Sequence, residues 1–220
     1  MLLRHSSRTL RIGVPVRLLS QLLLCAVILG GCASGPKPVE TESSQAAADE
    51  RLKDVPTKAL TLFEQAASAM AAGDSIDAEL RFKEFVLQYP GYPGAFVNLA
   101  ILNAQAGDDQ SAEGYITDAL IIDPAHPEAL NQLGMLLRRQ GKFIEAESAY
   151  LKAVTASPDY ALAHYNLGVL NELYLQRLDA ALQHFERYQA IEGEEKQVTK
   201  WIADLKRRLD AQQRAANAAE

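Results

Sequence analysis

The chain has 220 residues, of which 22 are basic and 28 are acidic, and its formal net charge is −6. This balance argues against a nucleic-acid partner, because binding to nucleic acid depends on the neutralisation of phosphates by Lys and Arg. Only two cysteines are present, Cys25 and Cys32, and both lie near the N-terminus.

The N-terminal segment 1–31 has the three parts of a secretory signal peptide. An acid-free start is followed by a short apolar run, LLSQLLLCAVIL, and then by small residues. The basic residues of the start are Arg4, Arg8, Arg11 and Arg17. The run is too short to cross a bilayer as a helix, which takes about 20 residues. We therefore predict that segment 1–31 is cleaved.

The end of this segment, Leu29-Gly30-Gly31-Cys32, resembles the lipobox of bacterial lipoproteins. The resemblance implies that Cys32 receives a diacylglycerol thioether, becomes the first residue of the mature chain and is acylated on its new amino group. Two or three acyl chains hold a protein firmly to a membrane, whereas one holds it only weakly. Alanine instead of aspartate at position 33 favours, by the same resemblance, the periplasmic face of the outer membrane.

Two alternatives for this N-terminus are an ordinary cleaved signal that leaves Cys32 as a free thiol, and an uncleaved anchor. Cleavage with lipidation removes Cys25 and uses Cys32, so no thiol is left for a disulfide, a metal site or catalysis. It also removes four arginines and leaves 18 basic and 28 acidic residues, a net charge of −10.

The next segment, residues 32–55, is rich in Pro, Ser, Ala, Glu and Lys and nearly lacks large apolar residues. Such a composition buries too little surface to offset the entropy of ordering the chain. We predict that it is the lipidated N-terminus followed by a flexible tether.

Segment 56–193 is an internal repeat with a constant period, which is the mark of solenoid proteins. Three independent series share this period: Pro90, Pro124 and Pro158; Gly73, Gly107 and Gly141; Ala78, Ala112 and Ala146. The series predict four units, at about 59–92, 93–126, 127–160 and 161–193.

The units resemble the tetratricopeptide repeat (TPR) family. The third unit matches the family pattern best, through Leu130, Leu133, Gly134, Ala146, Tyr150, Ala153 and Pro158. The fourth unit needs one extra residue near Tyr174–Leu178, and it ends at Gly193 instead of Pro. The resemblance implies an all-α solenoid of antiparallel helix pairs. The same fold follows from apolar residues at helical spacing, separated by glycine-containing turns.

A C-terminal segment, residues 194–213, has one apolar stripe at i, i+3, i+4, i+7 spacing. The stripe consists of Val198, Trp201, Ile202, Leu205 and Leu209. We predict a capping helix that covers the last repeat, followed by a frayed tail over 214–220. The alternative is a helix that binds a partner.

No catalytic or metal-binding pattern is found outside the signal segment. His126, His164 and His184 lack the spacing of metal ligands, and no sequence motif of a nucleophile or phosphate loop is present. We therefore predict neither an enzyme nor a metal, cofactor or small-molecule substrate, apart from the covalent lipid on Cys32.

Positions that face the ligand in TPR proteins recur at i, i+4 and i+7 or i+8 on the first helix of each unit. They predict a partner groove for a protein or peptide, lined by Val97, Asn98, Ile101, Gln105, Asn131, Met135, Arg138, Arg139, Tyr165, Asn166, Val169 and Glu172. Asn can bond a peptide backbone as donor and acceptor. Alternatively, Asn98 and Asn166 only tie neighbouring helices together.

Three of the predicted groove residues, Val97, Ile101 and Val169, could equally be core between repeats. Arg138 and Arg139 could receive a carboxylate of the partner or be an exposed helix end favoured by the helix dipole.

The function expected from these features is that of a membrane-anchored scaffold or adaptor in the bacterial cell envelope, for example in the assembly of a pilus. The alternative is a structural subunit of an envelope complex that packs through its outer surface or its cap helix.

Overall fold

The structure is a computed structural model that describes residues 55–219. The predicted signal peptide, the lipidation site Cys32 and the tether up to residue 54 lie outside the described residues. Within 55–219 the chain is made of helices and turns, without a strand, as the all-α prediction requires. No helix of this part combines the length and the apolar character needed to cross a membrane.

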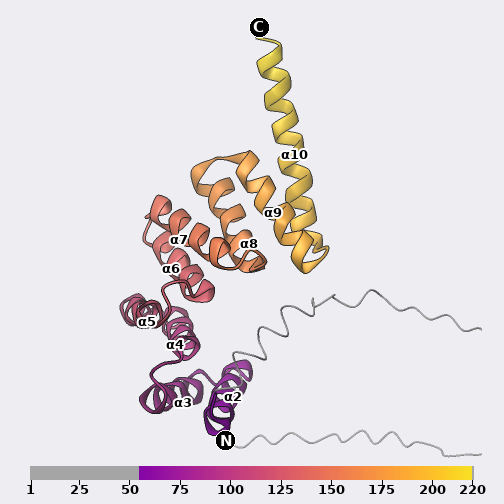
Figure 1. Ribbon diagram of the computed structural model, residues 1–220. Coiled ribbons are helices and arrows are strands. Elements are labelled where there is room, and N and C mark those ends of the chain that lie inside the picture. Colours follow the sequence, from indigo (N-terminus) through magenta and orange to yellow (C-terminus); the bar gives the residue numbers. More distant parts are fainter. Residues whose placement is uncertain (1–54, 220) are drawn as a thin grey trace, which may run out of the picture. The chain divides into compact units, whose positions relative to one another are not determined.

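Helices follow one another in pairs along the chain (Figure 1). The bounds are α2 Thr57–Ala71, α3 Ser75–Gln88, α4 Pro93–Gln105, α5 Asp109–Ile122, α6 Pro127–Arg139, α7 Phe143–Ala156, α8 Ala161–Leu170, the π-helical turn η1 Asn171–Leu175, α9 Leu178–Glu192 and α10 Lys196–Asn217. We call α2, α4, α6 and α8 the first helices, and α3, α5, α7 and α9 the second helices.

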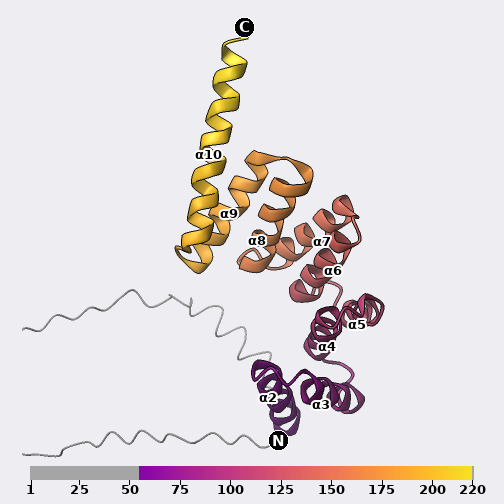
Figure 2. The same ribbon diagram turned by 180° about the vertical axis from the view of Figure 1, so that it is seen from behind.

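The first and second helix of each pair make the most extensive contacts, and each second helix then packs against the next first helix. Neighbouring first helices also touch, α4 with α6 and α6 with α8. The same order is seen from behind in Figure 2. These contacts confirm the predicted TPR solenoid with a cap helix at its C-terminal end.

The turns inside the first three pairs repeat one local structure. Gly73, Gly107 and Gly141 have φ of 80°, 82° and 76°, a left-handed conformation that glycine adopts without steric cost. Asp74 and Asp108 follow and accept a hydrogen bond from the backbone N–H three residues on, at 3.0 Å in both cases. Such N-caps satisfy a free donor at the start of each second helix.

Close approach of the two helices in the third and fourth pairs depends on a missing side chain. A Cβ placed on Gly134 would lie 2.5 Å from the ring of Tyr150, and one on Gly168 would lie 2.6 Å from the ring of Phe185. Both rings are fully buried. The ring of the second helix therefore packs directly on the backbone of the first helix.

The fourth pair departs from this pattern at its turn. Its extra residue is taken up by η1, a single π-helical turn at the end of α8. Gln176 then holds the left-handed position, with φ of 56°, which glycine occupies in the three earlier turns. For a residue with a side chain this conformation costs about 1–2 kcal/mol, so this turn is strained where the others are not.

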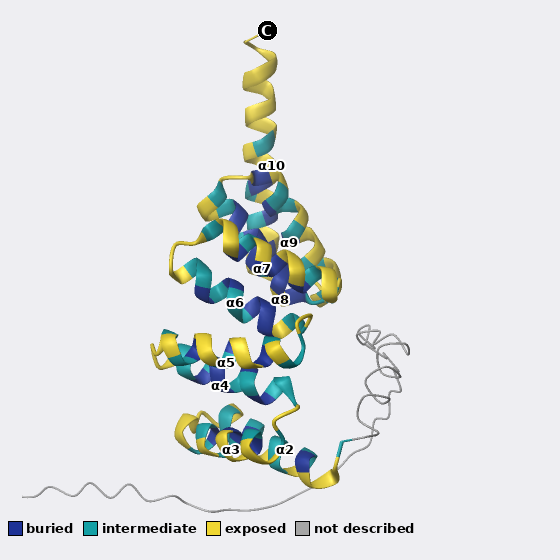
Figure 3. Ribbon diagram, turned by 60° about the vertical axis from the view of Figure 1, so that its left-hand side comes forward, coloured by how far each residue is buried: buried dark blue, intermediate teal, exposed yellow. Residues whose placement is uncertain are grey.

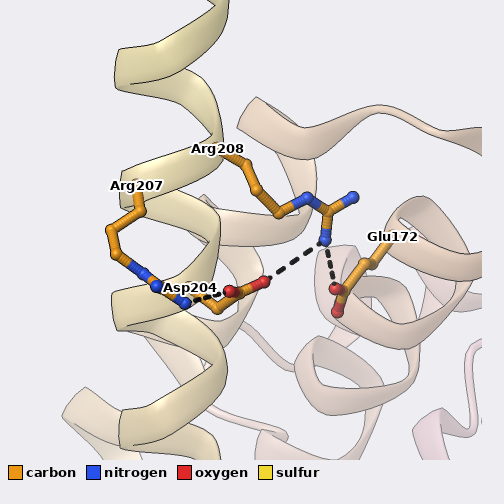
Figure 4. Close-up of polar contacts among 4 residues, drawn as sticks. All are labelled: Glu172, Asp204, Arg207 and Arg208. Atoms are coloured by element: carbon orange, nitrogen blue, oxygen red, sulfur yellow. Dashed lines mark hydrogen bonds and ion pairs between the residues drawn. The ribbon is translucent and has the colours of Figure 1, made fainter.

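The cap helix α10 covers the last pair with the predicted apolar stripe. Val198, Ile202 and Leu205 are buried, and the ring of Trp201 lies 5.5 Å from that of Phe185. Arg208 adds an ion pair to Glu172 of η1 at 2.8 Å, next to Asp204 and Arg207 of its own helix (Figure 4).

The predicted end of this helix at residue 213, with a frayed tail over 214–220, is corrected by the structure. α10 continues to Asn217, and its last turns hold a hydrogen bond from Gln213 to Asn217 at 3.1 Å. Ala, Gln and Arg dominate this stretch, and all three have high helix propensity. The helix persists there although residues 210–219 are all exposed (Figure 3).

Replacing Gly134 with alanine should destabilise the protein by about 1–3 kcal/mol, because the new methyl group would enter the space of the Tyr150 ring. Urea unfolding followed by circular dichroism measures the change. Gly114 is the matched control, since it lies on α5 and a Cβ added there would meet no atom within 4 Å. Gly114→Ala should stabilise by about 0.5–1 kcal/mol. Equal effects of the two substitutions would contradict the packing role of Gly134.

Candidate functional site

Three hollows follow one another along the first helices. The first, of about 250 Å³, is almost wholly apolar and lies where α2 meets the start of α4. The second, of about 490 Å³, shares Phe63, Gly94 and His126 with the first. The third, of about 390 Å³, shares Ile101, Gln132 and Leu162 with the second. Because each hollow shares part of its wall with the next, they form one continuous depression, which we call the groove.

Most of the predicted partner residues line this groove. They are Val97, Asn98, Ile101, Gln105, Asn131, Met135, Arg139, Tyr165 and Asn166. Three others, Val169, Arg138 and Glu172, line none of the three hollows. Val169 packs on the apolar cluster around Phe185, and Arg138 lies outside the walls. The prediction that these two side chains face the groove is therefore corrected. The fourth pair turns its Val169 toward the cap, and in the third pair Arg139 lines the groove where Arg138 does not.

Glu172 has a different role from the one that its spacing suggested. Only 15% of its side chain is exposed, and its carboxylate receives Arg208 of the cap helix (Figure 4). This residue belongs to the contact between η1 and α10 and not to the groove.

The floor of the groove holds buried polar groups. Asn131 and Asn166 are 1% and 7% exposed, and Asn166 Nδ2 donates a hydrogen bond to Asn131 Oδ1 at 2.9 Å. This bond ties α8 to α6. For Asn166 it therefore agrees with the alternative that this side chain connects neighbouring helices. Asn98 makes no such tie, since its Nδ2 donates to the carbonyl oxygen of Gly94 in its own helix at 3.1 Å. Val97 is buried in the floor beside it.

Several residues that line the groove were not predicted from the sequence. Gln132 stands one repeat period from both Asn98 and Asn166, so three carboxamides occupy one register in three successive units. The repeat period could have revealed this row. Leu162 is about half exposed in the groove, and Phe63 lines its first hollow. Phe63 stands one repeat period before Val97, so the period could have revealed it too, whereas Leu162 lies outside the ligand-facing positions of the family.

Few charges face the groove. Arg139 is paired with Asp109 of the preceding pair at 2.5 Å, which neutralises it in part. Glu128 lies beside His126, whose Nδ1 accepts a hydrogen bond from the backbone N–H of Ala129 at 3.4 Å. Burial, followed by the charge of Glu128, raises the pKa of Tyr160 to about 12, so its hydroxyl remains neutral and able to donate. The groove therefore suits a segment with little charge.

A pair of histidines lies between α8 and α9. His164 Nε2 lies 3.1 Å from the carbonyl oxygen of Pro158, an acceptor, so this nitrogen carries the proton. His164 Nδ1 must then accept a hydrogen bond from His184 Nδ1, which lies 3.1 Å away. Burial lowers the pKa of both rings, and burial together with His164 lowers that of His184 to about 4.

No group of three or more His, Cys, Asp or Glu side chains comes together for a metal ion anywhere in residues 55–219. The groove in the described residues has neutral polar groups on its floor and apolar side chains on its walls.

Comparison with known proteins agrees with this fold. The family model described as tetratricopeptide repeat matches residues 63–127 and 131–195. A search of curated proteins gave no significant match.

Among solved structures, one from the functional characterization of Pseudomonas aeruginosa pilF is 21% identical with a TM-score of 0.62, covering 70% of this chain and 69% of that one. A thermophilic TPR protein of Thermus thermophilus is 19% identical with a TM-score of 0.58, covering 74% of this chain and 89% of that one. MamA of Desulfovibrio magneticus is 22% identical with a TM-score of 0.57, covering 74% and 91%. At these identities the likeness concerns the fold alone.

Acidification should weaken the fold through the histidine pair. The folded protein keeps both rings neutral, whereas the unfolded chain takes up protons below about pH 6.5, so stability is full above that pH and falls as the pH drops toward 4. Lowering the pKa of His184 from 6.5 to about 4 on folding corresponds to about 3 kcal/mol of folding free energy. Because part of the pair contacts solvent, we expect a smaller loss of about 1–2 kcal/mol. Chemical unfolding across this pH range measures the loss.

The third pair supplies the control for this measurement. It has Leu130 and Ala149 at the positions of His164 and His184, as the matching Gly134–Tyr150 and Gly168–Phe185 contacts show. The double variant His164→Leu/His184→Ala should lose this part of the pH dependence. An unchanged dependence of stability on pH would contradict the role of the histidine pair.

Proposed function

Because the chain belongs to the tetratricopeptide repeat family, we propose that it is a scaffold that holds a segment of a partner protein in the groove along its first helices. The observation that carries this proposal is the continuity of the three hollows. They run without interruption from Leu60 and Phe63 on α2 to Leu162 and Tyr165 on α8. A depression that crosses all four pairs suits a chain segment better than a small molecule.

The side chains of the groove indicate how the segment is held. Gln132 offers its carboxamide, which can both donate to and accept from a peptide backbone. It stands in one row with Asn98 and Asn166, whose Nδ2 groups already donate to Gly94 and Asn131. The apolar first hollow, walled by Leu60 and Phe63, suits one large apolar side chain of the segment. Backbone bonds supply affinity in such a mode, and the side-chain hollow supplies selectivity.

We propose that this scaffold is anchored to a membrane of the bacterial envelope. The sequence Leu29-Gly30-Gly31-Cys32, after a basic start and a short apolar run, supports this localisation. The lipid would be carried by Cys32, on the periplasmic face of the outer membrane. The segment between Cys32 and Val55 would reach about 75–80 Å at full extension.

We propose that the scaffold serves the assembly of an envelope machine such as a pilus, without a catalytic step of its own. A second candidate is a structural subunit that packs through its outer surface. It is favoured by large apolar side chains that are exposed on the second helices, among them Ile76, Leu87 and Ile144.

Two groove substitutions should separate these candidates. The double variant Gln132→Ala/Leu162→Glu changes two side chains that line the groove. Gln132 is half-buried and Leu162 is exposed, so the core stays intact. We expect about tenfold less partner in crosslinking from envelopes, measured by quantitative mass spectrometry, since a buried charge and a lost hydrogen bond each cost about 1 kcal/mol or more.

The matched control is Ile144→Glu on α7, an exposed aliphatic residue outside the groove. It should leave capture unchanged. The opposite pattern, with capture lost only in Ile144→Glu, would favour the outer surface and reject the groove.

Replacing Cys32 with alanine tests the anchor. Without the acceptor thiol the protein should no longer incorporate labelled fatty acid, and it should move from the membrane fraction to the soluble periplasmic fraction, because the acyl chains supply most of the membrane affinity. Osmotic-shock fractionation and labelling measure both. A variant that stays in the membrane, or a parent protein that takes up no label, would contradict lipidation at Cys32.

A further inference from the structure

The charges of the described chain are divided unevenly between the repeats and the cap helix. α10 has six basic and two acidic residues, a net charge of +4. Residues 55–195 have nine basic and 20 acidic residues, a net charge of −11. A strongly acidic domain therefore ends in one strongly basic helix.

Four of these basic residues form a line on the side of α10 that faces solvent. They are Lys196, Lys200, Arg207 and Arg214, and we call them the cationic stripe. Their spacing of four, seven and seven residues keeps them on one side of a helix. All four are exposed, Arg207 with 78% of its side chain. At 1.5 Å per residue the stripe is about 27 Å long.

Packing of the fold does not account for the stripe. The basic residues at its edges do serve the fold, since Lys206 pairs with Glu186 and Arg208 with Glu172, each at 2.8 Å. Within the stripe only Arg207 has an acidic partner, Asp204 of the same helix (Figure 4). No carboxylate of residues 55–219 lies within ion-pair distance of Lys196, Lys200 or Arg214.

The end of α10 also lacks a partner within the described chain. Its buried positions stop at Leu205, and residues 210–217 are exposed on every side (Figure 3). Two helical turns without packing are only marginally stable in water. A bound segment that neutralises Arg207 and Arg214 would hold these turns in place.

We propose that the cationic stripe binds an acidic segment of a partner protein, as a second interaction surface separate from the groove. Charge complementarity favours a single extended segment as the partner. A narrow chain contacts only the stripe and avoids the repeats, whose net charge of −11 would repel it. A broad anionic surface, such as a lipid bilayer, would also meet these acidic residues. The apolar side of α10 is already used against α9, so nothing apolar is left to insert into a membrane.

The experiment titrates a fluorescent Glu-rich peptide with the full chain and follows its anisotropy at low and at physiological ionic strength. The variant Lys196→Gln/Lys200→Gln/Arg207→Gln/Arg214→Gln should bind the peptide about tenfold or more weakly, since four ion pairs are lost and each contributes modestly. The affinity of the parent chain should fall with salt. Circular dichroism should show unchanged helix content, because Gln is a good helix former.

The matched control removes four exposed lysines from the repeats, in Lys58→Gln/Lys83→Gln/Lys142→Gln/Lys152→Gln, with the same change in net charge. It should bind like the parent. If the control bound the peptide as weakly as the stripe variant, the effect would depend on net charge alone and the proposal would be overturned. It would also be overturned by binding of the parent to phosphatidylglycerol vesicles but not to the peptide, which would assign the stripe to a lipid surface. The groove variant Gln132→Ala/Leu162→Glu should bind the peptide normally, so the two surfaces are tested independently.

Discussion

The arrangement of this protein depends on a ring that packs against a bare backbone. Tyr150 and Phe185 lie directly on Gly134 and Gly168, so that the two helices of the third and of the fourth pair approach more closely than side chains would allow. Each pair alone is too small to bury its apolar residues, and only stacking against the next pair completes the core.

The groove is a consequence of this stacking. Because the units repeat with a constant period, a side chain at one register returns at the same place on the next first helix, which is how Asn98, Gln132 and Asn166 form a row. The walls vary from unit to unit, from an apolar hollow at Phe63 to buried asparagines at Asn166. A regular frame with variable walls is well suited to selective binding of a protein segment.

The last pair shows how the stack is ended. A π-helical turn and a left-handed Gln176 replace the glycine turn of the other pairs, and they carry Glu172 to Arg208 of the cap helix. The cap buries Val198 and Leu205 over the exposed end of the core. It thereby does for the last repeat what a further repeat would do, and it brings the most basic helix of residues 55–219 to this end.

The sequence by itself determined the units, the apolar stripe of the cap and the place of the extra residue in the fourth unit. Helix pairs are local structures, so their period is written in the positions of Gly, Ala and Pro. The lipobox is likewise a local pattern, and it stays a prediction. Tertiary structure alone decided which side chains face the groove, since packing on the cap turns Val169 inward, and Arg139 lines the groove where Arg138 does not. It also brought Asn131 and Asn166 together. Such contacts depend on how helices from different parts of the chain pack, and the period of a single helix does not contain that information.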